Sequence, residues 1–75
     1  MQMADVTIHL DETMDHDRRA AIADTVRAHK GVMGVAHHDT KPHLMIVEYD
    51  PEEVHARELL QVVRDEGVHA ELVGL

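Results

Sequence analysis

The sequence predicts one small α+β domain in which strands and helices follow one another in the order β-α-β-β-α-β. Three observations support this prediction. Apolar residues recur at every second position in four short segments, they recur at helical spacing in two longer ones, and turn residues stand where the spacing changes. This order is the split β-α-β arrangement, a ferredoxin-like sandwich. We therefore expect a four-stranded antiparallel sheet, in strand order 4-1-3-2, with two helices on one face.

The first half of the chain predicts a strand, a helix and a second strand. Apolar Val6, Ile8 and Leu10 alternate with polar residues, which is typical of a strand with one buried face. From about Arg18 to Lys30 the apolar spacing becomes helical, and the glycine that follows is a natural stop. A second strand is expected from Val32 to His38.

The second half predicts a hairpin partner, a helix and a last strand. A polar turn, residues 39–42, leads into a third strand in which Met45, Val47 and Tyr49 alternate with their neighbours. Asp50-Pro51 is expected to end this strand and to open the second helix, which Gly67 stops. The apolar stripe of this helix is Val54, Leu59, Leu60, Val62 and Val63, and the last strand contains Val68, Ala70 and Leu72.

Length and composition predict a single domain over residues 1–75, with its core between about residues 5 and 73. Hydrophobic residues make up 44% of the chain, but Tyr49 is the only aromatic one. The interior must therefore be built from aliphatic side chains and methionine. Such a thin core should leave only a modest margin over chain entropy.

Charge and residue content exclude several classes of function. The formal charge of −8 argues against a nucleic-acid partner, which would need a concentrated basic surface. No apolar run is long enough to span a membrane and no signal peptide is evident, so we expect no membrane insertion and a cytoplasmic location. Cysteine and serine are both missing, and no Gly-rich phosphate loop is present. Catalysis is therefore not expected.

The chain resembles the heavy-metal-associated domains of copper chaperones and metal-pumping ATPases over nearly its whole length. The residues that carry the resemblance are Ile8, Leu10, Ile22, Val26, Gly31-Val32, Val35, Tyr49-Asp50, Val54, Leu59, Val63 and Gly67. The same register places Asp15 and Arg18 where the family has the two cysteines of its Cys-x-x-Cys motif. Because arginine stays protonated and offers only donors, a thiolate copper(I) site is excluded here.

The loop that replaces this motif has two interpretations. Asp15, His16 and Asp17 offer two carboxylates and an imidazole, which suit divalent ions such as Zn, Ni, Co(II) or Mn. An aspartate at a helix start also caps backbone N–H groups and complements the helix dipole. The capping interpretation needs no metal.

Eight histidines in so short a chain give a second reason to consider metal chemistry. Two groupings follow from the expected strands. His37, His38 and His43 flank the hairpin turn, and His43 could share an ion with Asp39 and with either His38 or His37, since adjacent residues point to opposite faces. His9, His69 and Glu48 should all lie on the uncovered sheet face. Either grouping would suit Zn, Ni or Co(II), and either set of side chains also fits an ordinary wet surface.

The uncovered face is also expected to carry Leu44, Ile46 and Val73, which is more apolar than an idle surface needs. It is therefore the predicted interface for a homodimer or for another protein partner. The sequence thus leaves three functions open: a divalent-metal module without thiols, a protein-interaction or homodimer module that has lost its ion, and a small-molecule-sensing regulatory domain. The last rests on fold analogy alone.

Overall fold

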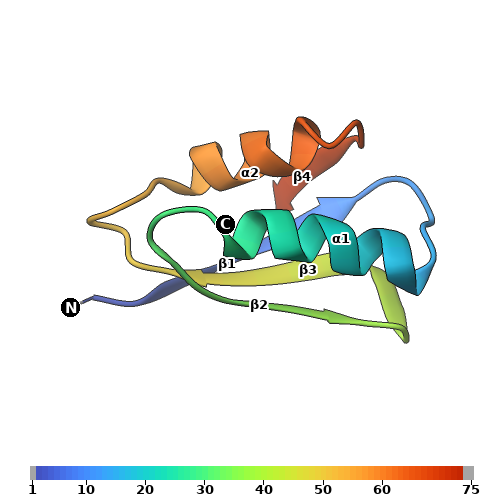
Figure 1. The fold of residues 1–75 in the computed structure, drawn as a ribbon, viewed down its shortest axis with the longest axis horizontal. Coiled ribbons are helices and arrows are strands. Elements are labelled where there is room, and N and C mark those ends of the chain that lie inside the picture. Colours follow the sequence, from blue (N-terminus) through green and yellow to red (C-terminus); the bar gives the residue numbers. More distant parts are fainter. Residues whose placement is uncertain (1, 74–75) are drawn as a thin grey trace.

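The computed structural model describes residues 2–73 and contains the predicted elements in the predicted order (Figure 1). They are β1 (Ala4–Leu10), α1 (His16–Arg27), β2 (Val32–His38), β3 (Lys41–Tyr49), α2 (Ala56–Arg64) and β4 (Ala70–Val73). All neighbouring strands pair antiparallel, in the order β2-β3-β1-β4. This order is 4-1-3-2 counted from the other edge, so the predicted fold class and topology are confirmed. No helix among the described residues is long and apolar enough to cross a membrane.

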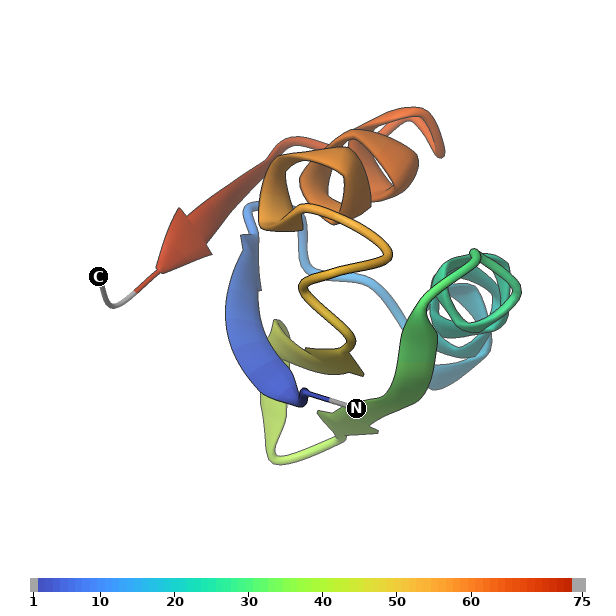
Figure 2. The ribbon, with the colours of Figure 1, turned by 90° about the vertical axis from the view of Figure 1, so that its left-hand side faces the viewer.

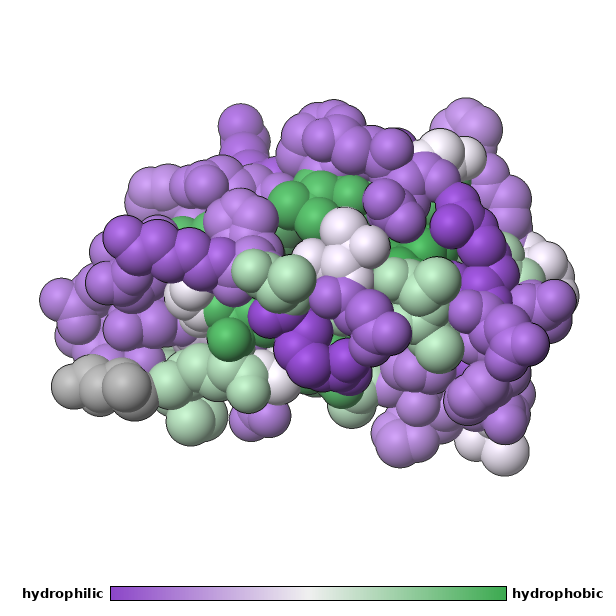
Figure 3. Space-filling view, viewed as in Figure 1, coloured by the Kyte–Doolittle hydropathy of each residue, from purple (hydrophilic) through white to green (hydrophobic). Residues whose placement is uncertain are grey.

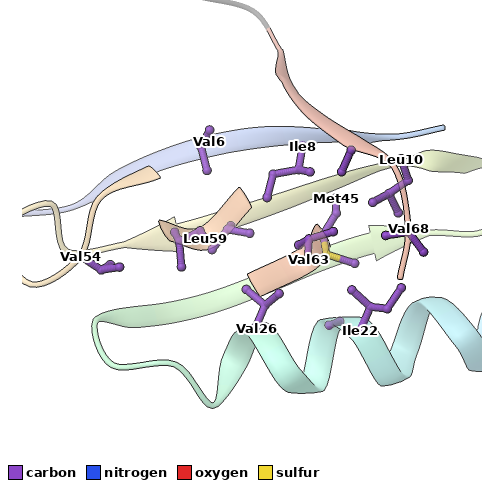
Figure 4. Close-up of a cluster of buried hydrophobic side chains, with 13 residues drawn as sticks. Val6, Ile8, Leu10, Ile22, Val26, Met45, Val54, Leu59, Val63 and Val68 are labelled. Atoms are coloured by element: carbon purple, nitrogen blue, oxygen red, sulfur yellow. The ribbon is translucent and has the colours of Figure 1, made fainter. Parts of the chain in front are cut away.

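Both helices lie on the same side of the sheet, and within residues 2–73 no element covers the opposite side (Figure 2). Between helices and sheet lies one aliphatic core, in which Ile22 and Val26 of α1 face Met45 of β3 (Figure 4). Leu59 and Val63 of α2 complete it and are fully buried. Seen from the helix side, hydrophilic residues cover most of the surface, and apolar ones show mainly in its middle (Figure 3).

The second helix begins later than predicted. Asp50 does not open α2; its carbonyl accepts the backbone N–H groups of Glu53 and Val54, and its carboxylate accepts that of Glu52. These bonds close a separate turn, so α2 starts only at Ala56. The prediction was wrong because the Asp-Pro signal fits a turn as well as a helix start. Val54 is buried as expected, but ahead of the helix.

The two edge strands of the sheet, β4 and β2, differ from regular strands. A side chain occupies a backbone acceptor of β4, and the pairing of β2 is irregular. On β4, the Arg64 guanidinium donates from Nε to the carbonyl oxygen of Ala70 at 3.0 Å. On β2, the pairing with β3 shifts register between Val32 and Gly34 and again between His37 and His38. The second shift lies at the hairpin turn, beside the start of α1, where the side chains of the candidate site meet.

Candidate functional site

The β1–α1 loop, residues 11–15, ends in a helix cap. Asp15 has extended backbone angles, and its carboxylate accepts the backbone N–H of Arg18 at 2.8 Å. α1 therefore starts at His16, two residues before the predicted position. The guanidinium of Arg18 reaches across to the carbonyl and carboxylate of Glu66. Asp15 and Arg18, at the positions of the resembled family's cysteines, thus make structural contacts, while Asp17 is exposed in the first turn.

A second contact fastens the same loop. The Glu12 carboxylate accepts the backbone N–H of His69 at 2.9 Å and the imidazole Nδ1 of His69 at 2.8 Å. The hydrogen bond from the His69 side chain, followed by that from its backbone, lowers the pKa of Glu12, while the bond to Glu12 raises the pKa of His69. The β1–α1 loop is therefore tied to the segment between α2 and β4.

The predicted group of His9, His69 and Glu48 is not assembled. His9 lies opposite Leu44 on one side and Glu71 on the other, whereas Glu48 lies opposite Asp5. Glu48 is four residues along β3 from Leu44, which separates it from His9 by roughly 13 Å. His69 is engaged by Glu12. The face of each strand was predicted from alternation, but the register between strands was not, and the register decides which residues meet.

His43 also pairs differently from the prediction. Its Nδ1 lies 2.7 Å from the carbonyl oxygen of Leu10, and its Nε2 lies 3.3 Å from the hydroxyl of Thr13. Its ring stacks on that of His9, with centroids 5.7 Å apart and planes inclined by 13°. Ring nitrogens bind metals in the plane of the ring, so parallel stacked rings do not direct them at one ion. His38 lies opposite Lys41, so the register does not pair it with His43.

Four side chains from three segments, α1, β2 and the β2–β3 turn, meet instead at the start of α1. We call this set the turn cluster: His16, Arg19, His37 and Asp39. The Asp39 carboxylate lies 2.9 Å from His16 Nδ1 and accepts a hydrogen bond from Arg19 Nη2 at 2.7 Å. The rings of His16 and His37 are tilted by 45°, with centroids 5.5 Å apart.

Burial differs sharply within the turn cluster. Arg19 is only 3% exposed, whereas the side chains of His16 and Asp39 are mostly in solvent. Hydrogen bonds from His16 and then from Arg19 lower the pKa of Asp39, which is therefore an anion. Burial, with the positive charge of Arg19, lowers the pKa of His37. The neutral imidazole, the form that binds metals, is thus favoured at His37.

Two polar atoms of the turn cluster have no hydrogen-bond partner among the described residues although they are buried: Nη1 of Arg19 and Nδ1 of His37. Buried polar groups are usually paired, so these two atoms are open to a partner such as an ordered water or an ion. Two imidazoles bound at about 2.1 Å to one tetrahedral ion place their centroids about 5 Å apart, close to the observed spacing of His16 and His37. Nevertheless, no group of three or more His, Asp or Glu between residues 2 and 73 is arranged to hold a metal.

Arg19 was not singled out from the sequence, and His37 was considered only as the alternative to His38 for facing His43. Two signals could have found them. Arg19 follows His16 by three residues, so the two share a helix face, and His37 has the parity of Val35, which packs against the core. What brings both to Asp39 is the packing of α1 against the end of the hairpin, which local spacing does not encode.

The strand order and the two helices on one face define a small domain with a ferredoxin-like fold. The sequence matches no protein-family model and no curated protein sequence. Among solved structures, oxidized MerP from Ralstonia metallidurans CH34 superposes with a TM-score of 0.86 at 14% identity, covering 97% of this chain and all of that one. The copper chaperone of Enterococcus hirae, in its apo form, has a TM-score of 0.81 at 24% identity, covering 91% and 98%.

A copper-binding domain of the P-type ATPase HMA7 is similar too, with a TM-score of 0.84 at 14% identity over 93% of each chain. Identities this low show a shared fold. They support the fold that the sequence resemblance implied, while the residues that carry a function in this chain have to be argued from its own side chains.

Proposed function

We propose that this domain binds a divalent transition metal, Zn, Ni or Co(II), through imidazole and carboxylate donors of the turn cluster. The observation that carries the proposal is the spacing of His16 and His37 beside the Asp39 carboxylate. Two nitrogens and one oxygen suit borderline divalent ions. Neighbours of the same fold are described as copper-binding domains and as a copper chaperone, which supports a metal-related role.

Binding requires a rearrangement within the turn cluster. Asp39 is held by Arg19, so an ion has to replace the guanidinium as the partner of this carboxylate, or to bind through the two imidazoles and water. The buried guanidinium opposes a nearby cation, whereas the net charge of −8 attracts one. These opposing terms predict moderate affinity, and weaker binding at low pH because protons compete with the ion for the imidazole nitrogens.

The test is titration of the untagged protein with Zn, Ni and Co(II), followed by calorimetry. The double variant His16→Ala/His37→Ala should lose binding by at least about tenfold. The matched control is His38→Ala, because His38 is exposed next to His37 beyond the register shift. No heat with any of the three ions would refute the metal function. If substitution of His9 and His43, and not of His16 and His37, removes metal binding, the ion binds outside the turn cluster.

We keep protein contact through the uncovered sheet face as a second candidate function. Ile46 and Val73 are 38% and 40% exposed there, and Leu44 is partly exposed. Apolar groups on an otherwise polar surface are typical of partner sites. Self-association predicts a solution mass above 8.5 kDa that returns to 8.5 kDa in Ile46→Asp. Light scattering that gives 8.5 kDa for both proteins would rule out the homodimer.

A further inference from the structure

The uncovered side of the sheet can be described residue by residue from the strand register. We call it the open face, and its residues are Asp5, Thr7, His9, Gly34, Ala36, Leu44, Ile46, Glu48, Glu71 and Val73. None of them is Lys or Arg. Lys41 is the one Lys or Arg in the described strands, and it lies at the turn, at the start of β3.

An apolar row crosses the open face from one edge to the other. In the register of the sheet, Ala36 pairs with Ile46, Ile46 with Thr7, and Thr7 with Val73. The row therefore carries one long apolar side chain on β3 and a second apolar one on β4, with small residues beside them. Leu44 extends it along β3. Side chains of this kind give a partner apolar surface to bury.

Apart from His9, the titratable side chains of the open face are all acidic. Asp5 and Glu48 lie directly opposite each other on β1 and β3, and like charges in this position destabilise a sheet. The Glu48 carboxylate lies over the face, since a Cβ at Gly34 would be 3.3 Å from its Oε1. Glu71 adds a third carboxylate opposite His9. Neither Asp5 nor Glu48 forms an ion pair with a described residue.

We propose that the open face binds a cationic amphipathic helix of another protein, with its apolar stripe on Ile46 and Val73 and its Lys or Arg residues beside Asp5, Glu48 and Glu71. The inference rests on the second function proposed above and names the partner's chemistry. A second copy of this chain would bring the same carboxylates face to face, and an anionic membrane would be repelled. A basic helix relieves the like-charge pair and covers the row, as α1 and α2 do on the other side.

The test is an NMR titration of the full chain with a synthetic Leu/Lys amphipathic helix of about 18 residues, which is about 27 Å long. This length matches the 25 Å middle dimension of the domain. We expect amide shifts at Thr7, Leu44, Ile46 and Val73, and a binding constant that weakens as salt is raised. A peptide with Glu in place of every Lys should not bind.

Matched variants separate specific contact from attraction by the net charge. Asp5→Asn/Glu48→Gln should weaken binding about tenfold, while Glu52→Gln/Asp65→Asn, with the same change in charge away from the strands, should weaken it about twofold or less. If the two double variants weaken peptide binding equally, the proposal of a cationic partner is refuted. If the Lys and the Glu peptide both bind and Ile46→Asp abolishes the binding of both, the open face is a docking surface but its partner is not required to be cationic. That outcome would refute the cationic partner. Shifts confined to the helices would refute both.

Discussion

Two glycines with nearly the same φ provide a matched test of how the connection between α1 and β2 packs against the turn at residues 50–54. Gly31 has φ +85° and Gly67 has φ +88°, so alanine at either position enters a region that costs an L-residue about 1 kcal/mol. Their surroundings differ. A Cβ at Gly31 would lie 2.8 Å from Glu53 Cβ and 2.9 Å from Val54 Cγ1, whereas a Cβ at Gly67 meets nothing within 4 Å.

The clash at Gly31 cannot be relieved by moving a flexible chain end. Both contacts are at or next to the Cβ atom, Val54 is buried, and the carbonyl of Gly31 accepts the Asp50 N–H at 2.8 Å. Overpacking of this kind adds about 1–3 kcal/mol. We therefore expect Gly31→Ala to lower the free energy of unfolding by about 2–4 kcal/mol and Gly67→Ala by only about 1 kcal/mol.

Urea unfolding followed by circular dichroism measures this difference, and thermal unfolding provides a second measure. In a domain of this size each kcal/mol lowers Tm by about 4–8 °C, so Gly67→Ala should melt a few degrees lower and Gly31→Ala far lower. The entropy that alanine removes from the unfolded chain is the same in both variants and cancels in the comparison. Equal destabilisation by the two substitutions would refute the reasoning about the contact with the turn at residues 50–54.

Three further outcomes are expected. The Glu12–His69 pair stabilises the fold at pH values above 4.5, the ordinary pKa of Glu, because folding lowers the pKa of Glu12. Folding also raises the pKa of His69 above its ordinary 6.5, so the stabilisation that depends on protonated His69 is lost as pH rises through that raised pKa. The stability lost in Glu12→Gln should thus be largest near about pH 5.5 and smaller at about pH 8 in urea titrations, and an equal loss at both would contradict it. Because the pKa of His37 is lowered from 6.5, folding becomes less favourable as pH falls below that value, and His37→Gln should flatten the pH dependence of unfolding. Leu59→Ala should cost about 3 kcal/mol in chemical denaturation because the side chain is fully buried, against about 1 kcal/mol or less for Ile46→Ala, and similar costs would show that the core is misassigned.

Much of the fold could be predicted because each element carries its own local signal. Alternation assigned β1 and the inward side of β3, and the bounds predicted for β2 are those observed. The start of α2 could not be predicted in the same way, since Asp50-Pro51 fits a turn as well as a helix start and only the hydrogen bonds to Asp50 distinguish them. Element types follow from spacing, whereas boundaries depend on which of two local hydrogen-bond patterns forms.

The candidate site could be predicted less well, because it depends on contacts between distant segments. His16 and Asp39 were both considered from the sequence, but for different sites, and their hydrogen bond joins residues 23 positions apart. Alternation placed Ile46 and Glu48 on the outward side of the sheet. It did not show that Glu48 lies opposite Asp5, because one face of a strand is compatible with several registers.

The hydrogen bond from Arg64 to Ala70 has a consequence for assembly. The carbonyl of His69 accepts the N–H of Asp11 on the β1 side, so that of Ala70 faces outward, where an added strand would need it. The arginine occupies this acceptor, and β4 is only four residues long. The opposite border is interrupted by the two register shifts of β2. Neither border offers a long template for strand addition, which protects a small domain with a thin core from growing into fibrils.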